Sequence, residues 1–366
     1  MPDKFRGLYL HIPFCSVKCY FCDFTAFSGQ NLWQERYLRA LEKELSSYSH
    51  LPTQTLYIGG GTPTELSLRG LERLGRILQR AGRLQNMQEA SCEAHPGSLS
   101  REKLSLLYQA GIRRLSIGLQ SSEDHLLKLA GRRHDHKSFL KAYETAREAG
   151  FSNVNVDLIY GLPGQDLSGW KKTLRQVASL APEHISAYGL QVEEKTLLYK
   201  KGVPTDPDLA AAMYERAQEV LSREGYRQYE LSNFAKPGYA CRHNLLYWTG
   251  EEYLGIGCGA SSYISGTRWS NASTLPDYCG RLERGERPVA FQERLAGKAG
   301  LGEGILLRLR TREGVRWNDA MEKAFAHSRR RLLRWELLEA NHNRLRLTSR
   351  GMLLANQVFR EFVPPF

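Results

Sequence analysis

Hydrophobic positions follow two alternating patterns between residue 8 and about residue 225. Short runs rich in Val, Ile, Leu or Tyr end near Gly, Pro or a polar residue, which is typical of buried parallel strands. We expect strands at 8–12, 55–59, 90–94, 114–119, 153–160 and 185–190. The stretches between them are amphipathic: Leu38, Leu41 and Leu45 share one helical face, and Leu71, Leu74 and Leu78 share another.

This alternation of strand and helix predicts a parallel sheet with helical crossovers. Local signals agree, because Ser100 has the character of a helix N-cap and Gly111 that of a C-cap glycine. Periodicity does not decide whether the sheet closes into a barrel. In either arrangement ligands bind at the carboxyl ends of the strands, so the site is expected along that rim.

The alternation stops after about residue 235, which predicts three segments. Residues 1–235 form the β/α core, 236–285 a Gly- and aromatic-rich connecting segment, and 286–366 a smaller α+β domain. Within the last two segments we expect helices near 275–287, 317–337 and 349–362, and β-like runs near 345–347. The segment 305–310 belongs to the same small domain.

Composition is that of an ordinary globular protein, with 366 residues of which 42% are hydrophobic and 25% charged. The net charge of +12 favours contact with anionic surfaces, such as an anionic membrane or an acidic partner. The alternative is that the arginines only solvate helix faces, as in the run Arg329-Arg330-Arg331. We do not expect a nucleic-acid partner.

Two features of the sequence predict the cellular location of the protein. No stretch approaches the roughly 18 apolar residues that a membrane span needs. The start, Met1-Pro2-Asp3-Lys4, has no apolar region behind it. We therefore expect a cytoplasmic protein that contacts the inner membrane peripherally, if at all.

Three of the seven cysteines, Cys15, Cys19 and Cys22, fall within eight residues near the N-terminus. An odd number with such clustering does not resemble a disulfide framework and favours metal ligation in a reducing compartment. Three thiolates on one loop can bind three irons of a [4Fe–4S] cluster and leave the fourth open. A structural zinc site would need a fourth ligand, which is not found nearby, and incidental clustering is the remaining alternative.

Other polar and glycine residues follow the ends of the next five strands. They are Gly59, Gly60, Gly61 and Thr62 after the second, Glu93 at the third, Gln120 at the fourth, Asp157 and Gly161 at the fifth, and Gln191 after the sixth. Each has a structural alternative: the glycines can form a simple turn, and Glu93 can be a solvated strand end. Asp157 lies between Val156 and Leu158 and must be hydrogen-bonded if that strand is buried.

The stretch from Tyr9 to Phe24, YLHIPFCSVKCYFCDF, resembles the signature loop of radical S-adenosylmethionine (SAM) proteins. In detail it is similar to the branch that contains the oxygen-independent coproporphyrinogen III dehydrogenase, HemN, and its relatives, and the resemblance extends along the entire chain. It implies an α/β fold: a partial (β/α)6 radical SAM barrel with a smaller C-terminal α+β HemN-type domain.

The resemblance also implies cofactors and the residues that bind them. A [4Fe–4S] cluster on the three cysteines would chelate SAM and, once reduced, cleave it to methionine and a 5′-deoxyadenosyl radical. The positions that match the family's SAM contacts are Tyr9, Phe21, Gly60, Gly61, Thr62, Glu93, Gln120, Arg132, Asp157 and Gln191. Among these, Arg132 could instead belong to an exposed Arg132-Arg133-His134 patch.

Two departures distinguish relatives within the branch. The dehydrogenases have a further cysteine two residues after the third cluster cysteine, where this chain has Phe24. Residues 243–248, HNLLYW, resemble the HNxxYW motif of the HemW-type haem chaperones. This resemblance implies that His243 ligates haem iron, with Tyr247 and Trp248 offering flat faces to the porphyrin.

The first hypothesis is therefore a haem chaperone on a radical SAM scaffold, which binds haem and delivers it to respiratory haem proteins. The second is a porphyrinogen dehydrogenase, which Phe24 and the HNxxYW motif disfavour. The third is a radical SAM enzyme acting on another substrate. Whether the chain is an enzyme, and whether SAM is cleaved during its work, stays open at this point.

Overall fold

The computed structural model describes residues 6–82, 84 and 87–365. The sequence Met1-Pro2-Asp3-Lys4, which motivated the expected location, lies outside these residues. Seven strands run parallel in one large sheet: β11 (Glu252–Ile256), β1 (Arg6–Ile12), β4 (Thr55–Gly60), β5 (Glu89–Ala94), β6 (Arg114–Gln120), β7 (Asn153–Tyr160) and β8 (His184–Gly189). The six predicted strands are thus confirmed as consecutive neighbours.

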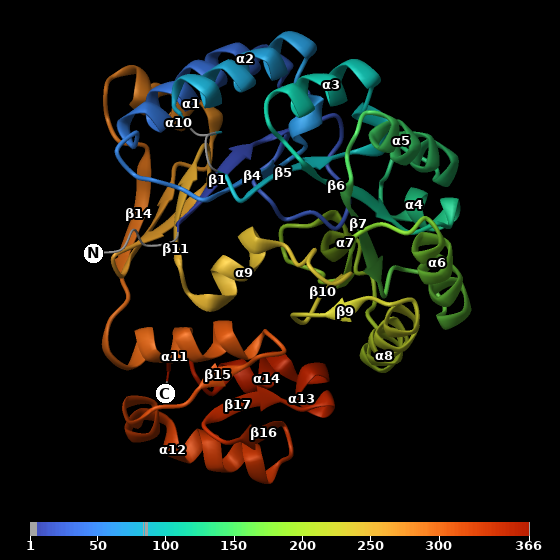
Figure 1. Cartoon of the computed structure of the whole chain (residues 1–366), viewed down its shortest axis with the longest axis vertical. Helices are drawn as coiled ribbons and strands as arrows, with labels where there is room; N and C mark the ends of the chain where they lie inside the picture. Colours follow the sequence, from blue (N-terminus) through green and yellow to red (C-terminus); the bar gives the residue numbers. More distant parts are fainter. Residues whose placement is uncertain (1–5, 83, 85–86, 366) are drawn as a thin grey trace.

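Antiparallel strands extend both sides of this parallel core. β12 (Ser261–Ile264), β13 (Thr267–Asn271) and β14 (Val289–Arg294) follow β11 on one side, and β10 (Asn233–Ala235) and β9 (Arg227–Gln228) follow β8 on the other. The two outermost strands, β14 and β9, are not paired with each other among the described residues. The sheet is therefore an open arch, which confirms a partial barrel (Figure 1).

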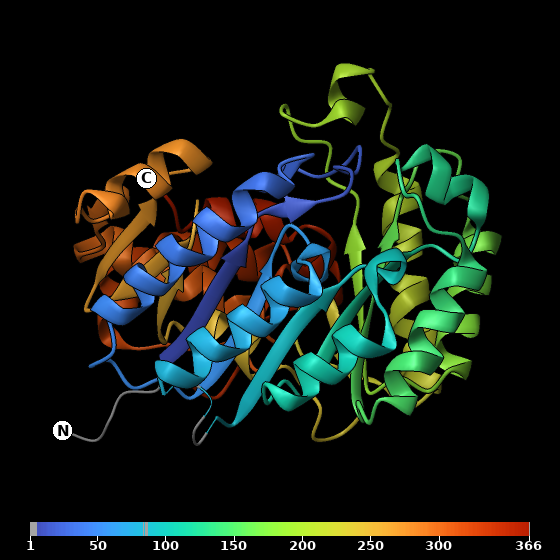
Figure 2. The same cartoon turned by 90° about the horizontal axis from the view of Figure 1, so that it is seen from above.

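Helices cover the outer face of the arch (Figures 1 and 2). They are α1 (Gln34–Ser47), α2 (Leu68–Arg80), α3 (Arg101–Gln109), α4 (Asp124–Leu129), α5 (His136–Glu148), α6 (Leu167–Ser179) and α8 (Pro207–Arg223). Side chains cap several of them: the Ser100 hydroxyl accepts a hydrogen bond from the Lys103 amide, and Gly111 adopts a positive φ of 83° after α3. Both predicted caps are confirmed.

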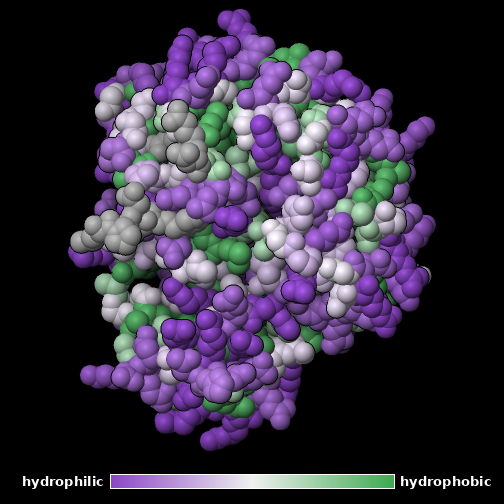
Figure 3. Space-filling model, viewed as in Figure 1, coloured by the Kyte–Doolittle hydropathy of each residue, from purple (hydrophilic) through white to green (hydrophobic). Residues whose placement is uncertain are grey.

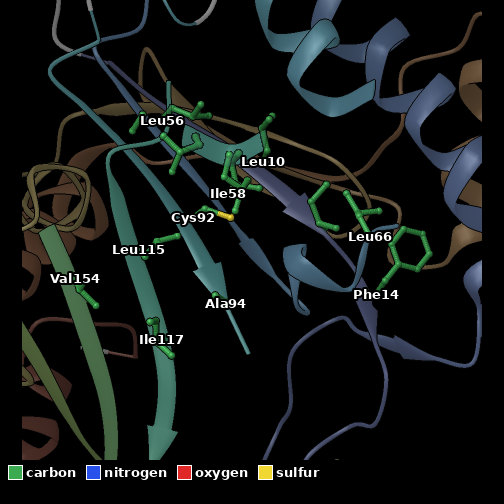
Figure 4. Close-up of a cluster of buried hydrophobic side chains, with 14 of the residues drawn as sticks. Leu10, Phe14, Leu56, Ile58, Leu66, Cys92, Ala94, Leu115, Ile117 and Val154 are labelled. Atoms are coloured by element: carbon green, nitrogen blue, oxygen red, sulfur yellow. The ribbon is translucent and has the colours of Figure 1, made fainter. Parts of the chain in front are cut away.

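Side chains of the central strands alternate between the two faces of the arch. Leu10, Leu56, Ile58, Cys92 and Ile117 point outward into the main hydrophobic core beneath the helices (Figure 4). The alternate positions carry polar side chains on the inner face, among them Glu93, Ser116, Asn155, Asp157 and Ser186. The strands are buried on both faces, but only the outer face is apolar.

The segment 236–285, expected to be a connection, adds structure to the main sheet. After α9 (Arg242–Thr249), it supplies β11, which pairs in parallel with β1, and the hairpin strands β12 and β13. Its helix α10 (Leu275–Glu283) confirms the helix expected near 275–287 and packs against α1. α9 itself lies on the inner side of the arch (Figure 1).

Residues 297–362 form what we call the C-terminal lobe, which has its own hydrophobic core. It contains α11 (Gly297–Leu309), α12 (Asp319–Arg334), α13 (Ser349–Leu353), α14 (Ala355–Arg360) and a small sheet of β15 (Val315–Arg316), β17 (Arg344–Leu347) and β16 (Leu338–Asn341). The segment 305–310 is the end of α11. The lobe lies across the open side of the arch, next to α9 (Figure 1).

Two main-chain hydrogen bonds attach the C-terminal lobe to the barrel. The Leu231 amide donates to the Arg310 carbonyl, and the Arg312 amide donates to the Tyr229 carbonyl, at 3.1 and 3.0 Å. The surface is mostly hydrophilic, with hydrophobic residues in scattered patches on the face in Figure 3. None of the described helices combines the length and apolar character that crossing a bilayer requires.

Candidate functional site

The three clustered cysteines lie on the loop between β1 and α1, where the first parallel strand ends. Cys15 is in the short strand β2 (Phe14–Cys15), which pairs with β3 (Phe27–Ser28). The Thr62 hydroxyl approaches the Cys15 sulfur at 3.7 Å, and Arg132 Nη1 donates to the Cys19 sulfur at 3.4 Å. Burial raises the pKa of Cys15 to about 11 and also raises that of Cys22. These two thiols thus need a Lewis acid, such as iron, to ionise near neutral pH.

This donor set fits a cluster better than a single ion. All three thiols line one cavity, but no group of three His, Cys, Asp or Glu side chains in the described part of the chain is placed to hold one metal ion. A tetrahedral zinc site needs its ligands around one centre, whereas a [4Fe–4S] cluster distributes three thiolates over three irons. The geometry therefore favours the cluster over zinc.

The glycines after β4 bring the backbone close to neighbouring side chains. A Cβ atom at Gly59 would lie 2.9 Å from the Glu93 carboxyl, and one at Gly60 would lie 2.6 Å from the His11 ring. Gly60 also adopts a φ of 111°, which side chains rarely tolerate. These contacts explain why glycines are needed here: the Gly60 amide reaches Glu93 Oε2 at 3.1 Å.

Two carboxyl groups on the inner face dominate the electrostatics. Burial and the charge of Asp157 raise the pKa of Glu93 to about 7, although Tyr57 donates a hydrogen bond to it at 3.0 Å. Burial raises the pKa of Asp157 as well, despite hydrogen bonds of 2.8 Å each from Ser116 and Asn155. The site is thus poised to accept a cationic ligand, which would favour both ionised carboxylates.

Gln120 and Arg132 meet where β6 ends. Gln120 has a φ of 75° at a register shift between β6 and β7, and a Cβ atom at Gly118 would lie 2.9 Å from its side-chain amide. Arg132 Nη2 donates to the Gly118 carbonyl at 2.5 Å, while its Nη1 contacts Cys19. Arg132 is therefore part of the site and not of an exposed patch.

One cavity of about 930 Å³ collects most of the predicted residues. Its lining includes Cys15, Cys19, Cys22, Phe21, Gly60, Gly61, Thr62, Glu93, Gln120, Arg132, Asp157 and Gln191. Tyr9 and His243 are not in the lining. The Tyr9 hydroxyl instead pairs with His11 Nδ1 at 3.1 Å, and its ring stacks on that of Tyr57.

His243 lies at the start of α9 and is 1% exposed. Its Nδ1 is 2.9 Å from the Thr55 hydroxyl and its Nε2 is 2.9 Å from the Tyr247 hydroxyl. A Cβ atom at Gly7 would lie 2.9 Å from the imidazole, so the ring packs directly on the β1 backbone. Iron ligation by His243 stays a prediction, and it requires the ligating ring nitrogen to leave its hydroxyl partner, while the other nitrogen can keep its hydrogen bond.

The other face of α9 reaches the cavity, where Asn244 and Trp248 form part of the wall. Sequence reasoning missed several further lining residues: Tyr57 and Ser116 on the strands, Glu230 before β10 and Asn233 at its start, and Arg310, Met352 and Asn356 in the C-terminal lobe. Strand alternation with Glu93 and Asp157 could have identified Tyr57 and Ser116. Nothing in the sequence marks the lobe residues, because only the chain's return to the barrel places them here.

Comparison with known proteins agrees with these features. Residues 9–177 match the radical SAM superfamily. The chain is 35% identical to the heme chaperone HemW of Lactococcus lactis over 99% of this chain and 98% of the relative. It is 36% identical to the heme chaperone HemW of Bacillus subtilis over 98% of this chain and 99% of the relative.

A solved structure resembles the fold over its full length. It is the coproporphyrinogen III oxidase HemN from Escherichia coli, described as a radical SAM enzyme, with a TM-score of 0.86 and 24% identity. The match covers 100% of this chain and 92% of that chain. At this identity the similarity shows a common architecture, including the C-terminal lobe.

Proposed function

The chain belongs to the HemW family of radical SAM proteins, and from this premise we propose that it binds haem and transfers it to respiratory haem proteins. The observation that carries the proposal is the position of α9. Two residues of its HNxxYW motif, Asn244 and Trp248, share one cavity with the three clustered cysteines. An indole offers a flat apolar face with a polar edge, which suits a porphyrin.

The radical SAM domain implies a [4Fe–4S] cluster and SAM. Cys15, Cys19 and Cys22 would hold the cluster, and the described geometry fits that assignment. Bound together, the two groups supply one-electron chemistry at the SAM sulfonium.

The charged side chains of the proposed SAM pocket suit different groups of SAM. Glu93 and Asp157 would favour the cationic groups of SAM, and Arg132 its carboxylate. Gly60 and Gly61 present main chain to the cavity, while Gln120 and Gln191 offer amide groups along the rim. Phe21 supplies an apolar face beside the cysteines. Tyr9 would act through Tyr57, on which its ring stacks.

The cavity is large enough for more than SAM. Its volume of about 930 Å³ is near the upper end of the roughly 300–1,000 Å³ usual for small-molecule sites. Its wall combines strand ends of the barrel with residues of the C-terminal lobe. A cofactor at the strand ends and a planar cargo between α9 and the lobe would occupy different parts of it.

The proposed haem acceptors and cellular location rest on the net charge of the chain and on its family. The net charge of +12 suits a cytoplasmic protein that visits an anionic inner membrane, where respiratory haem proteins reside. Binding to liposomes with anionic head groups should weaken as salt rises, because exposed charges are screened. Binding that ignores salt, or no binding, would remove the membrane contact from the proposal.

The test is anaerobic reconstitution with iron and sulfide, followed by haem titration with and without SAM. We expect near-stoichiometric haem uptake, transfer to an apo haem protein of the respiratory chain, and no conversion of coproporphyrinogen III. Conversion of the porphyrinogen would assign the chain to the dehydrogenases. Phe24, 65% exposed at the cavity mouth in place of their further cysteine, argues against that result.

A further inference from the structure

Five residues in the lining of the main cavity carry a buried polar atom that has no hydrogen-bond partner among the described residues. Arg132 lies apart, beside the cysteines; the four atoms that lie together are Trp248 Nε1, Arg310 Nε, Glu230 Oε2 and Asn233 Oδ1. Leaving a buried donor or acceptor without a hydrogen bond costs roughly 1–3 kcal/mol, so such atoms rarely gather without a reason. Here they gather where the barrel, α9 and the C-terminal lobe meet.

The four residues form one continuous set of contacts. The Arg310 guanidinium lies over the Trp248 ring, 4.4 Å from its centroid. Arg310 Nη2 is 3.8 Å from Glu230 Oε2, and Asn233 Nδ2 donates to the other Glu230 oxygen at 2.6 Å. The two donors, the indole N–H and the guanidinium Nε–H, thus belong to residues in direct contact.

The ion pair with Glu230 does not satisfy Arg310. At 3.8 Å the two groups attract but are too far apart for a hydrogen bond, which needs about 3.2 Å or less. Glu230 is 0% exposed and its hydrogen bonds, from the Ser232 amide and Asn233, both go to Oε1. Burial raises the pKa of Glu230, although the nearby charge of Arg310 lowers it.

We propose that Arg310 and Trp248 form a carboxylate subsite that binds a propionate side chain of the haem cargo. The inference rests on the proposed function and names the part of the cargo that is recognised. A planar guanidinium with an adjacent indole N–H matches the two oxygens of a carboxylate. With the guanidinium over the indole, the cavity wall at Leu231 and Tyr214 remains for the edge of the macrocycle.

Among the described arginines of the lobe, only Arg310 lines the main cavity. Arg329 and Arg331 also carry a buried Nε without a partner and lie over Trp317 and Trp335, but they are outside that lining. Arg312, Arg346 and Arg350 line a second cavity of about 540 Å³, which shares Arg310, Leu231 and Met352 with the main one. Arg346 and Arg350 donate to the main-chain carbonyls of Glu313 and Trp335, and neither lines the main cavity. Arg350 therefore provides a matched control: it carries the same charge on the same lobe, outside the proposed subsite.

The first test uses the reconstituted wild-type protein and changes only the ligand. Haem and its dimethyl ester, which lacks both propionate charges, are titrated in the same buffer. We expect the ester to bind at least about tenfold more weakly than haem, because it loses at least one charge-assisted hydrogen bond. Equal affinities would overturn the subsite and leave haem binding intact. Failure to bind either porphyrin would instead refute the proposed function.

The second test removes the donors. In Arg310→Met and Trp248→Phe, haem should bind about tenfold more weakly, while the affinity for the dimethyl ester should stay within about twofold of wild type. Arg350→Met should resemble wild type for both ligands. Because Trp248→Phe keeps an aromatic ring and loses only the N–H, it tests the subsite even where Arg310→Met unfolds. An equal loss for haem and ester in Trp248→Phe would assign Trp248 to packing alone and overturn its part in the subsite.

Discussion

The imidazole of His243 stacks on the phenol of Tyr57, with ring centroids 5.3 Å apart and an interplanar angle of 25°. Tyr57 in turn donates to Glu93, whose other oxygen accepts from the Gly60 amide. One tyrosine thus links the start of α9 to the glycine segment of the proposed SAM pocket. His243 is therefore placed to fix α9 on the barrel, whether or not it also binds iron.

His243→Ala should destabilise the haem-free protein. The substitution removes the hydrogen bonds with Thr55 and Tyr247 and leaves a cavity against Gly7, so we expect a loss of about 2–4 kcal/mol in the free energy of unfolding. Urea denaturation without haem measures it, with the exposed His50→Ala as the control. A haem-free variant as stable as wild type would refute this structural role and leave ligation as the contribution of His243.

Glu93 should make stability depend on pH. Its pKa is raised from 4.5 to about 7 in the folded protein, so ionising it opposes folding, and stability falls as the pH rises from about 4.5 to 7. At pH 7.5 the cofactor-free Glu93→Gln protein should be up to about 3 kcal/mol more stable than wild type, and at pH 4.5 nearly equal to it. Urea denaturation at both values measures the difference. A difference that does not grow with pH would contradict a raised pKa.

Each cluster cysteine should be necessary for iron. After anaerobic reconstitution, Cys15→Ala, Cys19→Ala and Cys22→Ala should each retain less than about a tenth of the wild-type iron and sulfide, because the cluster needs a thiolate at each of three irons. Cys279→Ala provides the control, since Cys279 is buried in the main core on α10. Elemental analysis and absorbance measure the retained iron. If all three variants retain it, the cluster must be bound elsewhere.

Glu44 on α1 should be a structural carboxyl. It is buried and accepts hydrogen bonds from the Gly257 amide, the Asn271 side chain and the Tyr278 hydroxyl, which join α1 to the 252–283 segment. Glu44→Ala leaves those donors unpaired and should cost about 3 kcal/mol or more. Thermal unfolding measures the loss, and Glu42→Ala, which removes only surface ion pairs, should change stability by less than about 1 kcal/mol. Equal losses in the two variants would contradict this assignment.

Much of the barrel could be predicted from the spacing of its apolar residues. They recur at every second position in the strands and with helical spacing in the helices that cover them. The six strands of residues 6–189 were expected within about two residues at each end, and their carboxyl ends bring the predicted cysteines, Glu93 and Asp157 to one cavity. Parallel pairing makes this possible, because it places successive strand ends at one rim.

The remainder depended on contacts between distant segments. β11 has an ordinary apolar pattern, and only its pairing with β1 shows that it continues the parallel sheet. The environment of His243 likewise depends on Gly7 and Thr55, more than 180 positions away. Arg310 resembles other lobe arginines in sequence, and only its contact with Trp248 of α9 places it at the main cavity.

The unpaired edges of the arch have a mechanical consequence. In a closed barrel, strand number and stagger fix the diameter. Here β14 and β9 do not close on each other within the described chain, so no ring of main-chain hydrogen bonds sets the inner width. The C-terminal lobe spans the gap and is hydrogen-bonded to the barrel near Tyr229 and Leu231. Small rotations of the lobe would widen or narrow the space for cargo while leaving the strand ends around the cysteines unchanged.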